Sequence, residues 1–383
     1  MKIGEFSDSF IPIVDGVARV VKAYADNLSA RGDEVYVITP MDDTGYRGRF
    51  PFEIVDFRSF SIKDDIPWKV GFDQIDRHFA DRMKMIDLDI CHVHSPGFAG
   101  HAGIQYAKSH KVPLVGSFHS KYYDDFMMVT HSRAISKFGI KVVVDFYNRC
   151  DEVWAVSENA AQTLKDYGFN REIAVMPNGT ERRIINLQKV PETVERFKIR
   201  TDVPVLLFVG QINFKKNLRR TVEACSLLKK NGTDFQLVMA GMGPDAEAVR
   251  NLAESKGLSE NLIMTGHIND SEILDSLYYI SDLFVFPSIY DNAPMVLREA
   301  ACQHTPALVI RGSSSSEVIT DMVNGLVTED TNIDVYRAIK KFLSLDADAQ
   351  KKMGDNACNT IPRDWNGPLM DDIRNRYRAL VGC

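Results

Sequence analysis

Residues 288–306 combine a polar loop with the start of a predicted helix, and they have the residue types of a ligand site. Pro294 suits the first position of a helix, where its missing N–H costs nothing. The N–H groups that follow, from Met295 and Val296, suit an anion. Glu299 comes a little over one turn later, and an ionised carboxylate accepts two hydrogen bonds from a vicinal diol. Phosphate donors and a diol acceptor together indicate a nucleotide; the alternative is a surface Glu that stabilises the first turns of the helix.

Two further stretches have groups suited to the same kind of ligand. Gly210 ends a predicted strand and is followed within about two turns by Lys215 and Lys216 at a predicted helix start. Cations at a helix N-terminus oppose the helix dipole, so this pair suggests an anion brought from outside. A solvated lysine pair is the alternative. In Asp15-Gly16 a glycine opens a helix and leaves N–H groups that suit an anion, although plain turn geometry accounts for such a glycine without a ligand.

His92 and His94 alternate along a predicted strand, so they share one face of the sheet. Such a pair looks like half of a metal site, yet no third ligand is in view. We interpret the two histidines as structural or as lining a cleft, and we expect no metal site.

The segment 131–149 combines cations with an apolar face. Its cations are Arg133, Lys137, Lys141 and Arg149, and its apolar residues are Ile135, Phe138, Ile140, Val142 to Val144 and Phe146. This composition is typical of a basic amphipathic helix on a membrane surface. It fits equally a core helix with a solvated basic edge.

The elements that position these residues alternate between strand and helix along most of the chain. Residues 2–6, 17–30 and 34–39 form a first strand, helix and strand, which forces a parallel pair. A charged, aperiodic stretch at about 180–203 then separates this series from a second one that begins at 205–210. We therefore expect an α/β fold with two doubly wound, Rossmann-like domains, residues 1–183 and 184–361. Ligands bind at the carboxyl ends of such strands, so the predicted site is the cleft between the domains.

The remaining expected elements follow the same alternation. The expected strands are 52–57, 89–94, 113–117, 151–157, 173–176, 235–240, 261–265, 282–287 and 306–310, and the expected helices are 72–86, 98–109, most of 124–149, 158–167, 217–230, 245–254, 270–280 and 295–303.

Composition sets limits on the class of protein. At 383 residues the chain exceeds what one hydrophobic core usually covers, and 45% hydrophobic with 26% charged residues is typical of a soluble globular protein. A net charge of −6 argues against nucleic acid as a partner. The six scattered cysteines indicate reduced thiols. Neither a signal peptide nor a run of about 18 apolar residues is present, so we expect a cytoplasmic protein.

Several segments resemble the motifs of one known family. Asp291 and Glu299, followed by Ala300-Ala301 and Thr305-Pro306, resemble the E-x7-E motif and its continuation in the retaining glycosyltransferases of family four, which have the GT-B fold. Further similar segments are 7–17, 89–96, 116–120, 209–217, 240–243, 313–325 and Asp364-Trp365. The resemblance covers nearly the whole chain. It implies that a last helix, at about 362–383, crosses back to complete the N-terminal domain.

The resemblance implies transfer of a hexose from a nucleotide sugar, with a UDP-sugar as the expected donor, to a hydroxyl of a glycan, lipid or protein. The diphosphate would bind the N–H groups near Gly16 and Pro294 and be neutralised by Lys216, and the departing diphosphate would help to deprotonate the acceptor. The implied donor-binding residues are Gly16, Gly210, Gln211, Lys215, Lys216, Asn292, Ala293, Pro294, Met295, Val296 and Glu299, and the implied catalytic residues are His119, Asp291 and Glu299.

Each of the three catalytic residues has a distinct implied role. Glu299 would hold the ribose, Asp291 would hold sugar hydroxyls, and His119 would lie on the acceptor side near the reacting carbon. No D-x-D loop for a divalent metal is evident, so we expect neither metal nor cofactor. Lys216 and helix N-termini would supply the positive field instead.

Two positions depart from the family pattern. Gln211 stands where the family usually has Arg, which removes a bidentate clamp whose charge, but not geometry, Lys215 replaces. Asp291 stands where the family has Glu, and the shorter side chain reaches less far toward a sugar.

Other functions stay open at this point. One is a nucleotide-sugar epimerase on the same fold, which needs no acceptor; a phosphorylase would need a lysine-held pyridoxal phosphate that no motif here supports. Another is a degenerate protein that binds a nucleotide sugar without transfer. The membrane interpretation of 131–149 would add a peripheral contact with the inner face of the membrane.

Overall fold

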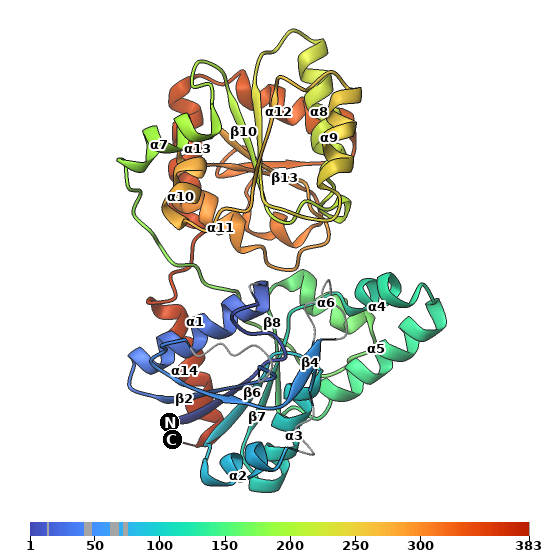
Figure 1. The fold of residues 1–383 in the computed structure, drawn as a ribbon, viewed down its shortest axis with the longest axis vertical. Helices are drawn as coiled ribbons and strands as arrows, with labels where there is room; N and C mark the ends of the chain where they lie inside the picture. The colour runs from blue at the N-terminus through green and yellow to red at the C-terminus, as the bar shows by residue number, and fades with distance from the viewer. Residues whose placement is uncertain (14, 42–47, 62–68, 72–75, 383) are drawn as a thin grey trace. The chain divides into compact units, whose positions relative to one another are not determined.

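The structure is a computed structural model that describes residues 1–13, 15–41, 48–61, 69–71 and 76–382. The chain divides into two compact units. Met1–Gly179 and Asp364–Cys383 form the N unit, and Thr180–Arg363 forms the C unit. Each unit contains a parallel sheet with helices on its faces, which confirms the predicted α/β class (Figure 1).

The N unit has a seven-stranded sheet in the order β3-β2-β1-β6-β7-β8-β9. Its strands are β1 (Lys2–Phe6), β2 (Glu34–Thr39), β3 (Glu53–Asp56), β6 (Ile90–Val93), β7 (Leu114–Phe118), β8 (Glu152–Ala155) and β9 (Ala174–Val175). The strand order reverses between β1 and β6, so the ends of these strands form the switch point at which ligands bind in such sheets. Register places Glu5 of β1 opposite His92 of β6.

The helices of the N unit are α1 (Gly16–Ala30), α2 (Arg77–Met85), α3 (Phe98–His110), α4 (Tyr122–Thr130), α5 (Arg133–Tyr147), α6 (Glu158–Asp166) and α14 (Pro368–Val381). Helix α1 begins where the Asp15 carboxylate accepts a hydrogen bond from the N–H of Ala18 at 2.8 Å. It buries an apolar face that includes Val20, Val21 and Leu28.

Helix α14 belongs to the N unit although it ends the chain. Arg374 donates two hydrogen bonds to the buried Asp33, at 2.6 and 2.9 Å, and Tyr377 is fully buried. Figure 1 shows α14 beside α1. One side chain of the last helix, Tyr377, thereby reaches the middle of the first sheet.

The C unit has a six-stranded sheet in the order β12-β11-β10-β13-β14-β15. Its strands are β10 (Val205–Val209), β11 (Gln236–Ala240), β12 (Leu262–Gly266), β13 (Leu283–Phe286), β14 (Ala307–Ile310) and β15 (Gly325–Thr328). Its helices are α7 (Lys189–Phe197), η3 (Phe214–Lys216), α8 (Leu218–Lys230), α9 (Ala246–Ser255), α10 (Ser271–Tyr279), α11 (Met295–Cys302), η4 (Ser314–Val318), α12 (Asn332–Leu343) and α13 (Ala347–Thr360). All residues of β10 and β13 are buried, as expected for central parallel strands.

The structure differs from the sequence expectation in several places, and β15, α12 and α13 lie where no element was predicted from the sequence. The stretch 180–203 was predicted to lack periodic structure, but it contains helix α7, which packs on α10 and buries Thr193; the division between the two units lies at the start of this stretch, between Gly179 and Thr180. The segment 124–149 forms two helices, because His131 adopts a left-handed φ of 50° that ends α4. A small antiparallel pair, β4 (Ser59–Ser61) and β5 (Lys69–Gly71), was not predicted. The start of the helix predicted at 72–86 lies outside the described residues.

Across the described ranges, no helix combines the length and the apolar character needed to cross a membrane.

Candidate active site

The C unit places two glycine loops in close contact at the ends of β10 and β11. Gly210 has a φ of 149° and Gly241 a φ of 140°, backbone angles that residues other than glycine rarely adopt. A Cβ on Gly241 would lie 1.9 Å from the carbonyl oxygen of Gly210. The N–H of Ile212 donates to the carbonyl of Met242 at 2.9 Å. These contacts fix the path of the chain from Gly210 to the predicted lysine pair, with Gln211 exposed between them.

The lysine pair lies in the short helix η3, directly before α8. The N–H of Lys215 donates to the Asn213 side chain at 2.9 Å, and the ammonium of Lys215 lies 4.9 Å from the ring centroid of Tyr290. Lys216 forms an ion pair with Asp291. The structure therefore brings a predicted donor-binding residue, Lys216, into direct contact with a predicted catalytic residue from another loop, Asp291.

Asp291 is held from both sides in the loop after β13. Ser288 donates from its hydroxyl to Asp291 Oδ2 at 2.5 Å, while Oδ1 faces Lys216. The Ser288 hydroxyl in turn accepts a hydrogen bond from the N–H of Tyr290 at 3.3 Å. Because each oxygen of Asp291 has one donor, the carboxylate has a fixed orientation at the strand end.

Helix α11 begins beside this loop without a side-chain cap. Pro294 is the N-cap residue, one position before the first helical residue to which the sequence assigned it, and no side chain bonds the first N–H groups. The contrast with α1 is direct, because Asp15 caps that helix. The uncapped N–H groups of Met295 and Val296 are donors suited to an anion. Asn292 and Ala293 lie in the same loop, with Asn292 buried.

Glu299 lies inside the packing between α10 and α11, so the surface alternative for this residue was wrong. Its side chain is buried, and the Tyr278 hydroxyl donates to Oε2 at 3.3 Å. Nearby, Arg183 donates to both oxygens of the buried Asp275 at 2.7 and 2.8 Å. The hydrogen bond with Asp275 raises the pKa of Arg183, and the charge of Glu299 adds to this effect. Glu299 is thus an internal carboxylate with a permanent cation close by.

Gly16 is the first residue of α1 in the N unit. A Cβ built at this position would meet nothing within 4 Å, so the packing of the described protein atoms does not require a glycine. Among the described residues, the N–H groups of Gly16 and Val17 have no acceptor, since the Asp15 side chain bonds Ala18. Val14, in the loop before it, lies outside the described residues.

The N unit contains a cluster of histidines at its own switch point. His94 follows β6 and His119 follows β7, and their rings meet with 3.1 Å between His94 Nδ1 and His119 Nε2. Glu5 accepts a hydrogen bond from His94 Nε2 at 2.6 Å. His92 lies beside His94, with 4.0 Å between ring centroids, which confirms that the two share a face.

Burial shifts the pKa values in this cluster. Burial lowers the pKa of His92 to about 4, and the charge of His94 acts in the same direction. Burial and the charges of His94 and His92 hold the pKa of His119 well below 6.5. For Glu5, burial raises the pKa, but His92 and His94 outweigh it and the pKa falls to about 2. Glu5 is therefore ionised at neutral pH, whereas His92 and His119 are neutral.

Glu5 was missed in the sequence, although a signal for it existed. It is a charged residue between the apolar Gly4 and Phe6 of a strand, and it supplies the third group that His92 and His94 lacked. The ring nitrogens of both histidines already have protein partners, namely Tyr377, Ser117, Glu5 and His119. We therefore describe the cluster as a hydrogen-bond network.

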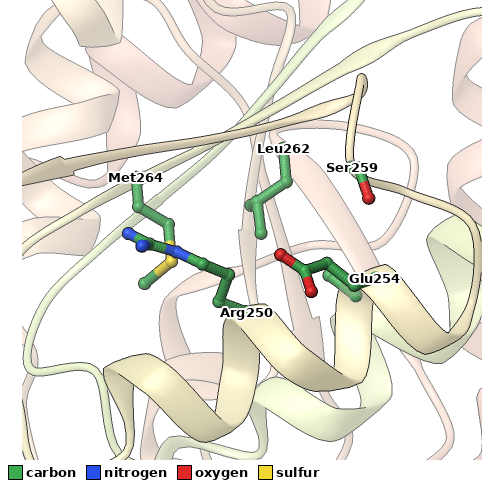
Figure 2. A pocket seen from close by; sticks show the side chains of 6 residues that line it. Arg250, Glu254, Ser259, Leu262 and Met264 are labelled. Atoms are coloured by element: carbon green, nitrogen blue, oxygen red, sulfur yellow. The ribbon is translucent and has the colours of Figure 1, made fainter.

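A separate hollow of about 220 Å³ lies on the rim of the C unit, between α9 and the edge strand β12 (Figure 2). It is lined by Arg250, Ala253, Glu254, Ser259, Leu262 and Met264. Pockets for cofactors and other small molecules usually measure about 300 to 1,000 Å³. The hollow is smaller and does not involve the predicted donor residues, so it is not a candidate donor site.

Comparison with known proteins agrees with the resemblance of the C unit loops to a glycosyltransferase motif. A family model described as Glycosyl transferases group 1 matches residues 190–360, and one described as Glycosyltransferase Family 4 matches residues 14–183. The chain belongs to the group 1 glycosyltransferases of family 4. The glycosyltransferase is 27% identical over 335 residues to the alpha-monoglucosyldiacylglycerol synthase of Streptococcus pneumoniae, covering 85% of this chain and 74% of the relative.

Two further comparisons extend this result. The glycosyltransferase is 23% identical over 341 residues to a GDP-mannose-dependent alpha-mannosyltransferase of Corynebacterium glutamicum, with 86% of this chain and 77% of the relative covered. Its fold matches that of Anabaena Alr3699/HepE in complex with UDP, with a TM-score of 0.78, 15% identity and coverage of 99% and 100%. The predicted GT-B fold and glycosyltransferase activity are confirmed, and nothing supports the epimerase alternative.

Proposed function

We propose that this glycosyltransferase retains anomeric configuration, needs no metal or other cofactor, and transfers a hexose from a UDP-sugar to a hydroxyl of a membrane lipid. The observation that carries the donor part is the contact of Lys216 with Asp291 beside the uncapped start of α11. These three features supply a cation, a carboxylate and backbone N–H donors at one strand end. A cation and N–H donors bind a diphosphate, and a carboxylate accepts hydrogen bonds from sugar hydroxyls.

Lys216 has a carboxylate counter-ion in the structure. A diphosphate carries more negative charge than Asp291, so it would displace Asp291 from Lys216. The released carboxylate would then accept hydrogen bonds from sugar hydroxyls, held by Ser288 in the orientation it already has. Positive charge on Lys216 and the N–H groups of α11 would stabilise the leaving diphosphate in place of a metal.

Glu299 would hold the ribose in this scheme. Its buried position on α11 keeps the carboxylate at a fixed distance from the helix start. Gly16 would offer its N–H to the diphosphate, and His119 would lie on the acceptor side. The placement of these two N-unit residues against the donor stays a prediction.

The donor proposal is tested by release of UDP. Purified protein is incubated with UDP-glucose, UDP-galactose, UDP-N-acetylglucosamine or GDP-mannose, with and without diacylglycerol in mixed micelles. Acceptor-dependent release of UDP from one UDP-sugar is the expected result, and an α-anomeric product from an α-linked donor checks retention. Release of GDP alone contradicts the choice of nucleotide. Donor binding without release with any acceptor would indicate the degenerate binding protein instead.

A matched pair of variants assigns the activity to the site. Glu299→Gln should lower kcat/KM by about 10²-fold or more, because a neutral amide donates where the ribose hydroxyls also donate. Glu254→Gln makes the same change on α9, away from the donor residues, and should leave kcat/KM unchanged. Equal effects of the two variants would contradict the role given to Glu299.

The lipid part of the proposal rests on an apolar surface over α4 and α5. Exposed apolar side chains gather there, namely Met128, Val129, Ile135, Phe138 and Val142. The two helices pack closely, since a Cβ on Gly139 would lie 2.6 Å from the Phe126 ring. The opposite face of α5 is buried, so the core-helix and amphipathic descriptions apply to different faces of one helix.

Cations accompany this α4–α5 surface. Arg133, Lys137 and Lys141 are exposed along α5 among the apolar side chains. Apolar groups that enter the headgroup region and cations that meet anionic lipids are the two requirements of a peripheral membrane helix. The named product of the Streptococcus pneumoniae relative, a glucosyl diacylglycerol, fits an acceptor drawn from the same membrane.

Sedimentation with vesicles tests the membrane contact. Wild-type protein should pellet with phosphatidylglycerol-containing vesicles at low salt and less with phosphatidylcholine alone. Phe138, which is 68% exposed, is replaced by Glu, and Met85, which is 86% exposed on α2, receives the same change as a control. Only Phe138→Glu should reduce binding. Absence of wild-type binding at low salt removes the membrane proposal and leaves the donor proposal intact.

A further inference from the structure

The side chain of Asn217 connects three segments of the C unit. Its amide nitrogen donates to the carbonyl oxygen of Pro287, after β13, at 3.2 Å. The same nitrogen donates to Asp330 Oδ1, after β15, at 2.8 Å. Asn217 itself lies between η3 and α8, in the segment that follows β10. One amide therefore joins the segments that follow β10, β13 and β15.

The orientation of this amide follows from its two partners. A carbonyl oxygen and an ionised carboxylate only accept hydrogen bonds, so the nitrogen of the amide faces both of them. Burial raises the pKa of Asp330, but hydrogen bonds from Asn217 and Arg220 outweigh it and hold the pKa below its usual range. Asp330 is therefore ionised at neutral pH, and each N–H bond of the amide has an acceptor.

Arg220 holds the carboxylate of Asp330 in place. From the first turn of α8, its Nε donates to Asp330 Oδ1 at 2.9 Å, and a terminal nitrogen donates to the Asn332 side chain at 2.8 Å. Asn332 begins α12, which packs against α8 (Figure 1). The acceptor of the Asn217 amide is thus fixed by groups outside the loops that carry the predicted donor residues.

The backbone at Asn217 suits this arrangement. Its φ is 60°, in the left-handed region that Asn adopts more readily than most residues. Its N–H donates to the Phe214 carbonyl at 2.9 Å, and Leu218 begins α8. The turn at Asn217 therefore ends the short helix that carries Lys216, while the side chain of Asn217 bonds the segment after β13.

The hydrogen bond from Asn217 to Pro287 has donor-site groups next to both of its ends. Lys216 directly precedes Asn217 in the chain. Ser288, which donates to Asp291, directly follows Pro287. A shift of Pro287 relative to Asn217 would therefore change the separation of the two loops at the point where Lys216 meets Asp291.

The two loops need a link that a ligand does not open. The register between β10 and β13 ends with the pair Leu207 and Phe284, before either loop begins. The ion pair of Lys216 with Asp291 connects the loops, but in the proposed function a diphosphate displaces Asp291. A hydrogen bond from a short side chain to a main-chain carbonyl is retained when that ion pair opens.

We propose that Asn217 is a positioning residue for the donor diphosphate. By holding the carbonyl of Pro287, it keeps Lys216 at a fixed separation from the loop of Asp291, both before and after the ion pair opens. The inference rests on the proposed function in one respect, namely that Lys216 binds a diphosphate.

Nucleotide binding measures this role without relying on transfer. Isothermal titration calorimetry with UDP and with GDP compares the wild type, Asn217→Gly, Lys216→Met and the double variant. Glycine accepts the left-handed backbone of position 217 and removes only the amide. Asn217→Gly should weaken diphosphate binding roughly tenfold, within the range of couplings between groups in contact.

The double variant distinguishes positioning from a general loss of structure. In the Lys216→Met background, Asn217→Gly should cause no further weakening, because the group that it positions is gone. No loss of affinity in Asn217→Gly alone overturns the proposal. An equal loss in both backgrounds also overturns it.

A second asparagine of the C unit provides the matched control. Asn261 donates from its amide to the Phe235 carbonyl, directly before β11, at 2.8 Å and accepts from Lys229 at 2.9 Å. It makes the same kind of contact at the amino-terminal ends of the strands, opposite to Asn217. Asn261→Ala should lower the unfolding temperature but leave nucleotide affinity unchanged. Weaker diphosphate binding in Asn261→Ala would assign both losses to stability and contradict the proposal.

An exchange of side chains separates the two hydrogen bonds of Asn217. In Asn217→Asp both are lost, and two carboxylates face each other. Addition of Asp330→Asn restores a hydrogen bond between the two positions with the roles reversed, but a carboxylate at position 217 still cannot donate to Pro287. The unfolding temperature should therefore recover while diphosphate affinity stays low. Recovery of both would show that the hydrogen bond to Pro287 does not position the donor groups.

The outcomes separate this inference from the proposed function. Binding of GDP instead of UDP contradicts the proposed nucleotide, and the same set of variants then tests Asn217 with GDP. If neither nucleotide binds, or if Lys216→Met binds as tightly as the wild type, the proposed donor site fails and the inference fails with it. If Lys216→Met weakens binding and Asn217→Gly does not, only the inference fails.

Discussion

The two units carry polar clusters at equivalent places, the switch points of their sheets, but the clusters are built differently. In the N unit, Glu5, His92 and His94 are fully buried and bond one another. In the C unit, Lys216 and Asp291 keep 17% and 18% of their side chains exposed and come from separate loops. Burial of polar groups costs desolvation free energy, so each group in a buried network needs a hydrogen-bond partner inside the protein. In a partly exposed ion pair, one residue can instead exchange its partner for a ligand. The N unit cluster is therefore suited to holding its side chains in one arrangement, and the C unit cluster is suited to binding a ligand.

The largest effect expected from this difference is on stability in the N unit. Glu5→Ala removes the acceptor of His94 and Tyr377 together, and breaking a buried charged network costs about 3 to 5 kcal/mol. Urea unfolding followed by tryptophan fluorescence measures it, because Trp154 lies 5.0 Å from His92 between ring centroids. A loss below about 1 kcal/mol would show that the buried carboxylate does not hold the cluster together.

Acid should weaken the same cluster. The pKa of His92 in the fold is about 4, against an ordinary 6.5, so the unfolded chain binds a proton first as pH falls. The contribution of neutral His92 is complete above about pH 6.5 and is lost between 6.5 and 4. It amounts to about 3 kcal/mol at most.

Urea midpoints at pH 7, 5.5 and 4 check this loss. His92→Asn removes the titrating ring, so the urea midpoint of this variant should depend less on pH between 6.5 and 4. This holds whatever the stability of the variant at pH 7. The depressed pKa of Glu5 acts in the same direction at lower pH, from about 4.5 down to about 2. A variant curve parallel to the wild-type curve would assign the acid loss to other groups.

A backbone change should have a smaller effect in the C unit. Gly241→Ala imposes both a φ of 140° and a Cβ 1.9 Å from the Gly210 carbonyl oxygen, so we expect a loss of about 1 to 3 kcal/mol. Gly257→Ala is the matched control, since its φ is 73° but a Cβ there meets nothing within 4 Å. Thermal unfolding by circular dichroism compares the two. Equal losses would mean that the φ angle alone, and not the contact between loops, requires Gly241.

The sequence predicted the C unit cluster better than the N unit cluster, for a physical reason. Gly210, Lys216 and Asp291 lie in loops after strands, where charged and special backbone residues interrupt an apolar pattern. Parallel strands end at one edge of a sheet, so their convergence could be expected. Their pairing could not, because it depends on side-chain rotamers.

The N unit network was only half visible. The alternation of His92 and His94 indicated that they share a face of the sheet. In the sequence alone, Glu5 is only a charged residue in a short predicted strand, and nothing there indicates its partners. Its partnership follows from the register of β1 against β6 and from Tyr377, 372 residues further along the chain. Helix α7 was missed for a related reason, since nine residues rich in charge make a helix only by packing on α10.

The smallest effect on stability is expected where the effect on activity is large. Lys216→Met and Asp291→Asn each break the ion pair, but the pair is partly solvated, so a double-mutant cycle should give a coupling of about 1 kcal/mol or less. Turnover should behave differently, since loss of the Lys216 charge removes stabilisation of the leaving diphosphate and should lower kcat/KM by about 10²- to 10³-fold. Lys215→Met removes a neighbouring cation that stacks on Tyr290 and should cost less. Thermal unfolding by circular dichroism and UDP release measure the two quantities on the same samples. A coupling of several kcal/mol would mean that the C unit pair is structural, like the buried network of the N unit, and that a ligand does not exchange with Asp291.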